Sequence, residues 1–340
     1  MSSVPWRVAW QHALYDAELG FYVTRGGPSA HFSTAAQGPT GAVLAEALLG
    51  LWDRYYPDRP PSVVVDVGAG RGELTSHVCA AVTRTAAAHP FARGGADRPR
   101  PRVVGVDVVD RPEGLDESID WIRSPGGAGL PADLRDLTNA LVVAHEWLDV
   151  VPCTVAEVAD DGTLREVLVD PATGDERRGP AVSTDDAAWA EQHWPRLSPG
   201  DRVEVGRSRD EAWAGLVARV RSGLVVGIDY GHLASERPSA GTLAAYRAGH
   251  LVHPLPDGSC DLTAHVAMDT LGAEELHRQR DMLLSLGVDA RMPDRATAAT
   301  DPIGYLRALE CASIEARLLD RSGFGAFWWS VQRVEAPDVP

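Results

Sequence analysis

Short apolar runs and longer helical repeats follow one another along most of the chain. The apolar runs predict buried strands at 63–67, 102–107, 140–144 and 224–229. Apolar positions at steps of three and four residues predict an amphipathic helix at 40–56, and further helices are predicted at 73–89, 185–193, 210–221, 273–286 and 303–321. A short strand is also predicted at 121–125, and a closing, antiparallel strand at 326–334.

Alternating strands and helices predict an α/β fold built on a doubly wound, mostly parallel sheet of seven strands with inserted helices. Residues 153–170 interrupt this order, because an Asp161-Gly162 turn between two alternating runs predicts a β-hairpin. We expect residues 171–181 to form a loop. Residues 1–60 are expected to form an N-terminal helical cap or substrate segment. Residues 61–340 are expected to form the main domain, with an insertion at about 153–222.

The most informative stretch is SVVVDVGAGRGELT at 62–75, where a glycine turn joins an apolar strand to a helix. In open α/β sheets such a turn forms a cofactor cradle at the carboxyl edge. Its glycines do not match the G-x-G-x-x-G dinucleotide pattern, and Asp66 precedes the first of them by two residues. S-adenosylmethionine (SAM) carries a sulfonium and an ammonium and no phosphate, so bare backbone beside an acid suits it. The alternative is a glycine-rich turn without a ligand.

We therefore expect the cofactor to be SAM, with S-adenosyl-L-homocysteine as its product. Asp66 is predicted to hold the ammonium, directly or through water, and Asp107 at the end of the second strand is predicted to bind the ribose hydroxyls. Asp107 has the alternative of capping a surface turn. The turn that holds the methionine end of SAM is expected to comprise Gly68, Ala69, Gly70, Gly72 and Glu73.

The fourth strand runs directly into HEWLDVVP, which places polar residues beside the same crevice. A guanidinium keeps its proton near neutral pH, so a methyltransferase acting on arginine needs acids that hold it. Glu146 and Asp149 are predicted to do this, unless Asp149 caps an exposed turn. His145 and His265 are further catalytic candidates, and Tyr230 is a weaker one for lining the pocket.

Composition and spacing exclude several other classes. The net charge of −16 gives no basic field for nucleic acid, and no apolar run approaches the roughly 18 residues that cross a bilayer. The N-terminus lacks the pattern of a secretory signal, and four widely spaced cysteines suit a reducing cytoplasm. His145-Glu146 lacks the second histidine of a zincin, and the cluster His250, His253, Cys260, Asp261 and His265 matches no closed zinc site, so we expect no metal.

Seven segments together resemble the MidA family of class I, Rossmann-like methyltransferases, which includes a mitochondrial complex I assembly factor with protein-arginine methyltransferase activity. In order they are ALYDAELGFY, HFSTA, VDVGAGRGEL, AHEWLDVVP, VVGIDYGH, GTLAAYRAGH and DLTAHV. The resemblance implies that Gly68, Gly70 and Gly72 line SAM, that HEWLD occupies the family's Asn-Glu-x-x-Asp motif, and that residues 61–340 form the methyltransferase domain. It also implies a protein or peptide substrate.

The chain departs from the family pattern beside the expected acceptor channel. Where the family commonly has Gly-Asp-Phe, this chain has Ala30-His31-Phe32. It has Ala36-Gln37 where the family has Pro-Glu, and His145 where the family has Asn. Two rival functions therefore stay open. One is a small-molecule or peptide methyltransferase in which His145 or His265 acts as a base, and the other is a non-catalytic assembly module. A homodimer also stays open.

Overall fold

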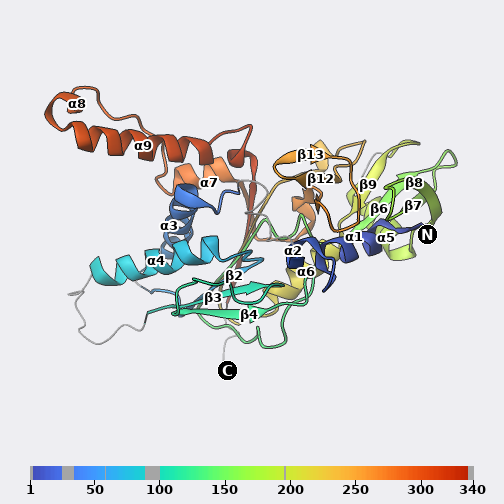
Figure 1. Ribbon diagram of the computed structural model, residues 1–340, viewed down its shortest axis with the longest axis horizontal. Helices are drawn as coiled ribbons and strands as arrows, with labels where there is room; N and C mark the ends of the chain where they lie inside the picture. Colours follow the sequence, from blue (N-terminus) through green and yellow to red (C-terminus); the bar gives the residue numbers. More distant parts are fainter. Residues whose placement is uncertain (1–2, 25–33, 58, 89–99, 195–196, 336–340) are drawn as a thin grey trace.

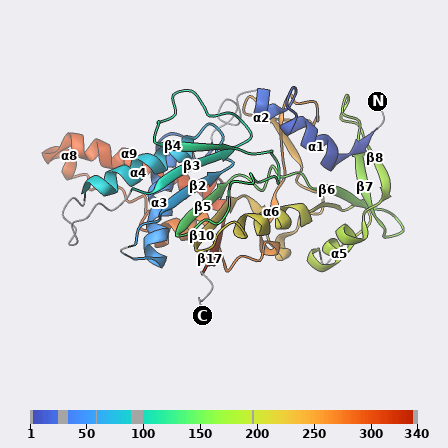
Figure 2. The same cartoon turned by 90° about the horizontal axis from the view of Figure 1, so that it is seen from below.

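A seven-stranded mixed sheet forms the centre of the computed structural model, which describes residues 3–24, 34–57, 59–88, 100–194 and 197–335. Its order is β16-β17-β10-β5-β2-β3-β4, and Figure 2 shows most of these strands side by side. The strands are β2 (Val63–Val67), β3 (Arg102–Asp107), β4 (Ile119–Arg123), β5 (Ala140–His145), β10 (Gly223–Asp229), β16 (Glu275–Arg278) and β17 (Trp328–Val334). The five from β4 to β10 are parallel, and β17 runs antiparallel to β10 as predicted. The α/β class is thus confirmed, while the doubly wound layout stays a prediction.

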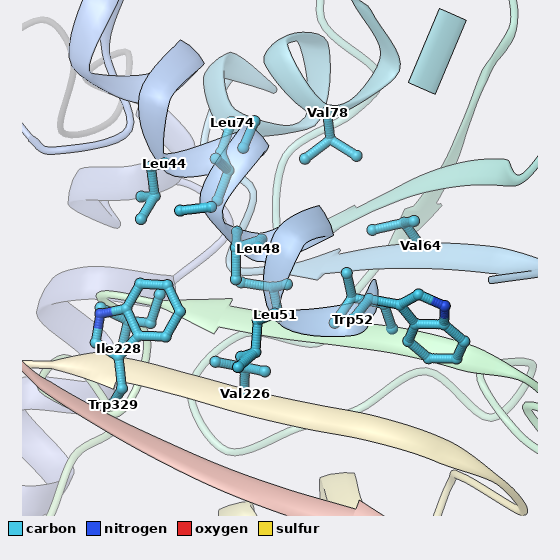
Figure 3. Close-up of a cluster of buried hydrophobic side chains, with 14 of the residues drawn as sticks. Leu44, Leu48, Leu51, Trp52, Val64, Leu74, Val78, Val226, Ile228 and Trp329 are labelled. Carbon is cyan, nitrogen blue, oxygen red and sulfur yellow. The ribbon is translucent and has the colours of Figure 1, made fainter. Parts of the chain in front are cut away.

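One face of this sheet is covered by helices from distant parts of the chain. They are α3 (Gly38–Tyr55), α4 (Glu73–Ala88), α7 (Gln279–Ser285) and α9 (Pro302–Leu318). Alternate strand residues such as Val64 and Val226 pack against Leu48 and Leu51 of α3 (Figure 3). The other strand residues face a second apolar cluster with α6 (Arg207–Val217). Buried on both faces, the central strands are almost entirely apolar, which made them recognisable in the sequence.

The segment after β5 and the N-terminal strand β1 form a second, antiparallel sheet with the order β1-β7-β6-β9 and β8 on β7. The predicted hairpin is confirmed as β6 (Thr154–Val158) and β7 (Leu164–Val169). The remaining strands are β1 (Val4–Pro5), β8 (Glu176–Ala181) and β9 (Arg202–Val205), and α5 (Thr184–His193) packs on β9. Figure 1 shows this sheet at the opposite end of the molecule from α9.

Two predicted elements were wrong in part. Residues 171–181 were expected to be a loop, but β8 extends the second sheet because its backbone pairs with β7. The helix predicted at 273–286 begins only at Gln279, because Glu275–Arg278 pairs with β17 as the edge strand β16. Residues 241–271 contain four short strands, β12 (Ala244–Arg247), β13 (His250–Val252), β14 (Asp261–Thr263) and β15 (Val266–Ala267).

Further elements complete the described chain. Near the N-terminus, α1 (Trp6–Tyr15) and α2 (Phe21–Thr24) pack beside β14, and β11 (Gly231–His232) pairs with β15. The short α8 (Thr297–Thr300) and α9 extend away from the sheet in Figure 1. Among the described residues, no helix combines the length and apolar character that crossing a membrane requires. The division at residue 60 stays a prediction, and Ala30-His31-Phe32 lies outside the described residues.

Candidate active site

Two adjoining cavities lie at the carboxyl ends of β2, β3, β5 and β10. The larger has a volume of about 650 Å³ and the smaller about 360 Å³. Both are lined by Gly68, Gly70 and Glu146. Because the strands are parallel, their polar end residues converge on one edge of the sheet, which is where the predicted cofactor site was placed.

The glycine turn separates the two cavities. Gly68 and Gly70 have φ of 74° and 60°, a conformation that favours glycine. A Cβ on Gly68 would approach the Trp147 side chain to 3.2 Å, so the bare backbone is needed there. Gly72 lines neither cavity. A Cβ at its position would meet Leu115 at 2.8 Å, so this glycine allows the segment between β3 and β4 to pack closely against the turn.

Asp66 and Asp107 lie on opposite sides of this turn. Asp66 lines the larger cavity and accepts a hydrogen bond of 2.6 Å from the Thr75 hydroxyl, and burial raises its pKa to about 7. Asp107 lines the smaller cavity and accepts a hydrogen bond of 2.8 Å from the Gly70 amide, which fixes the turn. Burial raises the pKa of Asp107 to about 6. Ala69 and Glu73 also line the larger cavity.

The turn after β5 holds Glu146 in an unusual backbone conformation. Its φ is 51°, in the left-handed region that side chains other than glycine seldom adopt. The buried carboxylate of Asp229, at the end of β10, accepts hydrogen bonds from the amides of Leu148 (2.9 Å) and Asp149 (3.1 Å). The end of the neighbouring strand therefore holds the turn that carries Glu146. Such enforced strain is typical of functional positions.

His145 and Glu146 lie side by side at the cavity without forming an ion pair near neutral pH. His145 Nδ1 is 3.5 Å from Glu146 Oε1. Burial lowers the pKa of His145 to about 4 and raises that of Glu146 to about 8, a rise to which Asp149 also contributes. Both groups are thus mainly uncharged at pH 7.

Asp149 is buried, so the alternative of an exposed capping turn is wrong. Its Oδ2 accepts hydrogen bonds from the hydroxyls of Tyr230 and Thr263. Nearby, Tyr22 donates a 2.7 Å hydrogen bond to Asp261, and burial raises the pKa of Asp261 to about 8. These side chains come from the first helices, the end of β10 and β14. The segment DLTAHV thus contributes three residues to the lining of the larger cavity, Asp261, Thr263 and His265.

A buried arginine, which sequence reasoning missed, connects the two segments that carry these acids. Arg209 on α6 is 1% exposed. It donates to the backbone carbonyls of Asp149 (2.8 Å) and Val151 (3.1 Å) on one side. On the other it donates to Ala264 (3.1 Å) and His265 (2.8 Å). Arg209 therefore positions the cavity wall. The exposed His265 ring lines the larger cavity and packs edge-on against Tyr230.

Three buried polar atoms in this region lack a hydrogen-bond partner among the described residues: His145 Nε2, Glu146 Oε1 and Asp149 Oδ1. Unsatisfied buried groups are costly, so their clustering at one cavity indicates a polar ligand. Acids around a glycine cradle suit SAM, whose sulfonium and ammonium are both cationic, and the two cavities give it room. Within the described residues, no three metal-binding side chains are grouped as a metal site.

A glycine cradle and converging acids at the edge of a parallel sheet define a cofactor-binding α/β enzyme. Residues 106–282 match the family described as "Putative S-adenosyl-L-methionine-dependent methyltransferase", and this match covers more than half of the chain. The chain therefore belongs to this family and is a SAM-dependent methyltransferase. The family assignment favours an enzyme over the non-catalytic assembly module.

Two solved structures from Burkholderia thailandensis share the fold. One is an uncharacterised COG1565 superfamily protein, with a TM-score of 0.74. The other is a COG1565 superfamily member bound to S-adenosyl-homocysteine, with a TM-score of 0.72. Each is 20% identical to this chain, and each alignment covers 97% of this chain and 87% of the other. No curated protein sequence matches the chain.

The raised pKa of Glu146 predicts a pH dependence of stability. Glutamate ionises near 4.5 in the unfolded chain and at about 8 in the folded protein. Between these values the folded state binds more protons, so the contribution of Glu146 to stability is complete below pH 4.5 and is lost as pH rises towards 8. Without cofactor, Glu146→Gln should flatten the fall of unfolding free energy between pH 5 and 8 by about 1.4 kcal/mol per pH unit. Urea denaturation across this range measures it. If the unfolding free energy of the wild-type protein and of Glu146→Gln has the same slope against pH, the pKa of the Glu146 carboxyl is not raised by burial.

Proposed function

We propose that this enzyme transfers the methyl group of SAM to an arginine side chain of a protein or peptide. The observation that carries the proposal is the acidic wall of the larger cavity, where Glu146 Oε1 and Asp149 Oδ1 are buried and have no hydrogen-bond partner among the described residues. A guanidinium offers five N–H donors and is always charged, so it can satisfy both oxygens. The resemblance to the MidA family supports the same substrate.

Each acid has a distinct role in this proposal. SAM, when bound, supplies a methyl group on an electrophilic sulfonium. Asp149, held by Tyr230 and Thr263, is fixed in place and orients the guanidinium. Glu146 sits at the junction of the two cavities, draws the positive charge away from the nitrogen that attacks the methyl group, and takes the proton that this nitrogen loses on methylation. Entry of the cation lowers the pKa of Glu146, so the carboxyl becomes the ionised form that accepts hydrogen bonds.

A second candidate is methylation of a hydroxyl or amine on a small molecule. One observation favours it: His145 is a buried, uncharged imidazole whose Nε2 has no partner among the described residues. Such a group can remove a proton from an acceptor. Under this function, transfer rates should fall on the acid side of the histidine pKa. The arginine reaction does not require prior deprotonation by His145.

Label transfer tests the proposal directly. The protein is incubated with methyl-labelled SAM and a cell lysate, and labelled material is separated into protein and small-molecule fractions. We expect the label on protein arginine, identified by hydrolysis and mass spectrometry, and excess S-adenosyl-L-homocysteine should suppress it. Label confined to a small metabolite would overturn arginine methylation and favour the second candidate. A His145→Gln variant then serves as the comparison, because only the second function needs its base.

A further inference from the structure

The larger cavity is lined by acids on its inner wall and has an arginine on its outer wall. Its inner wall carries Glu146 and Asp149, which follow β5, and Asp261 on β14. Its outer wall includes Arg317, in the last turn of α9, and the segment that follows it. The Arg317 side chain is exposed, and within the described part of the chain it makes no hydrogen bond or ion pair. A cation at the mouth of an acidic cavity suits a ligand that carries both charges.

An open surface groove continues the cavity past Arg317. It has a volume of about 620 Å³, lies between α7 and α9, and shares Arg317 and Asp320 with the cavity lining. The groove also contains Arg280 and Arg321. The cavity and the groove therefore meet at Arg317 and Asp320.

The acids of this groove already have partners. Asp289 pairs with Arg291 at 2.9 Å, and Asp320 accepts hydrogen bonds from the amide (3.0 Å) and hydroxyl (2.9 Å) of Ser322. Arg280 donates to the Leu319 carbonyl at 2.6 Å. Arg321, like Arg317, has no hydrogen bond or ion pair to the described residues. Two guanidinium groups are thus available along the groove.

We propose that Arg317 selects the acceptor by binding a carboxylate that lies close to the methylated arginine. This inference rests on the proposed function, because it assumes that the cationic end occupies the acidic wall. A guanidinium pairs with a carboxylate through two parallel hydrogen bonds, which gives direction as well as affinity. The carboxylate comes from an acidic side chain of a polypeptide or from the free carboxyl of an amino acid. The groove beyond Arg317 favours the polypeptide, because a single amino acid would leave it unused.

Matched peptides test this selection. The probes are glycine-based heptapeptides, blocked at both ends, with one arginine and one aspartate placed one, two or three residues away on either side. Identical peptides with asparagine are the controls, and free arginine is the third probe. With labelled SAM, we expect at least one aspartate peptide to have a kcat/KM at least about tenfold above that of its asparagine control.

Variants identify the residue responsible. Arg317→Glu should remove the preference for aspartate and favour the corresponding lysine peptide, an inversion that simple destabilisation would not produce. Arg307→Glu makes the same charge change on an exposed position of α9 outside all three cavities and should leave the preference intact. Calorimetry with S-adenosyl-L-homocysteine should give equal affinity for both variants.

The outcomes separate the two proposals. Equal methylation of aspartate and asparagine peptides would overturn the role of Arg317 and leave arginine methylation standing. If the enzyme methylates free arginine but none of the peptides, and Arg317→Glu abolishes this activity, Arg317 still binds a carboxylate. The proposal that this carboxylate belongs to a polypeptide would then be wrong. If the wild-type protein methylates none of the arginine probes, the proposed function fails, and the role of Arg317 fails with it.

Discussion

Replacing Glu146 by glutamine is expected to lower kcat for methyl transfer by about 100-fold while SAM affinity changes by less than about threefold. Glutamine keeps the size of the side chain, so the left-handed turn at this position should persist. It cannot carry the negative charge that stabilises the acceptor, and it cannot take the proton that methylation releases. Label transfer from SAM measures kcat, and calorimetry measures cofactor affinity.

The matched control for this change is Glu310→Gln on the exposed surface of α9. It makes the same side-chain change at a residue that lines none of the three cavities, and it should leave both quantities unchanged. If kcat of Glu146→Gln equals that of the wild-type enzyme, the Glu146 carboxyl has no role in methyl transfer. A parallel loss of SAM affinity would assign Glu146 to the cofactor, which is geometrically reasonable because the residue lines both cavities.

Replacing Arg209 by methionine is expected to lower the free energy of unfolding by about 3 kcal/mol. The guanidinium satisfies four buried backbone carbonyls, and its Cζ lies 5.6 Å from the Trp10 ring centroid. Methionine fills much of the volume but leaves these carbonyls unpaired. Arg209→Lys should lose less, because an ammonium can satisfy some of them. Urea denaturation at pH 7 compares the variants.

Arg307→Met is the control for this prediction, because Arg307 is exposed on α9 and should change stability by less than about 0.5 kcal/mol. Arg209 also positions the segments that carry Asp149 and His265, so Arg209→Lys should lower kcat more than SAM affinity. If Arg209→Met is as stable as the wild-type protein, the four carbonyl contacts contribute nothing net. If kcat is also unchanged, the positioning role is wrong.

The sequence predicted the centre of the fold because its signals are local. A fully buried parallel strand is a continuous apolar run, and the glycine turn has a backbone requirement that only a few residues meet. Hence β2, β3, β5 and β10 were located within a residue or two, and Asp66, Glu146 and Asp149 were correctly assigned to one sheet edge.

The missed features depend on contacts between distant residues. The strand β8 is polar and largely exposed, so only its pairing with β7 distinguishes it from a loop. Arg209 looks like one more charged residue on a polar helix, and its burial follows from the packing of α6 against two loops. Asp229 was detectable in principle, because an acid ends an otherwise apolar strand, but its partners lie about 80 positions earlier. Gly72 was predicted to line SAM; it lies close to Leu115 and lines neither cavity, and its part in cofactor binding stays a prediction.

Several acids of the larger cavity are partly or mainly protonated at neutral pH. Burial raises the pKa of Asp66 to about 7 and that of both Glu146 and Asp261 to about 8, so at neutral pH the cavity carries much less negative charge than its residues suggest. These carboxyl groups must release their protons before they can form ion pairs with a cationic ligand. Ligand occupancy and the acidity of the surroundings are therefore thermodynamically linked. A modest rise in pH would therefore increase the affinity of the enzyme for its positively charged ligands without any conformational change.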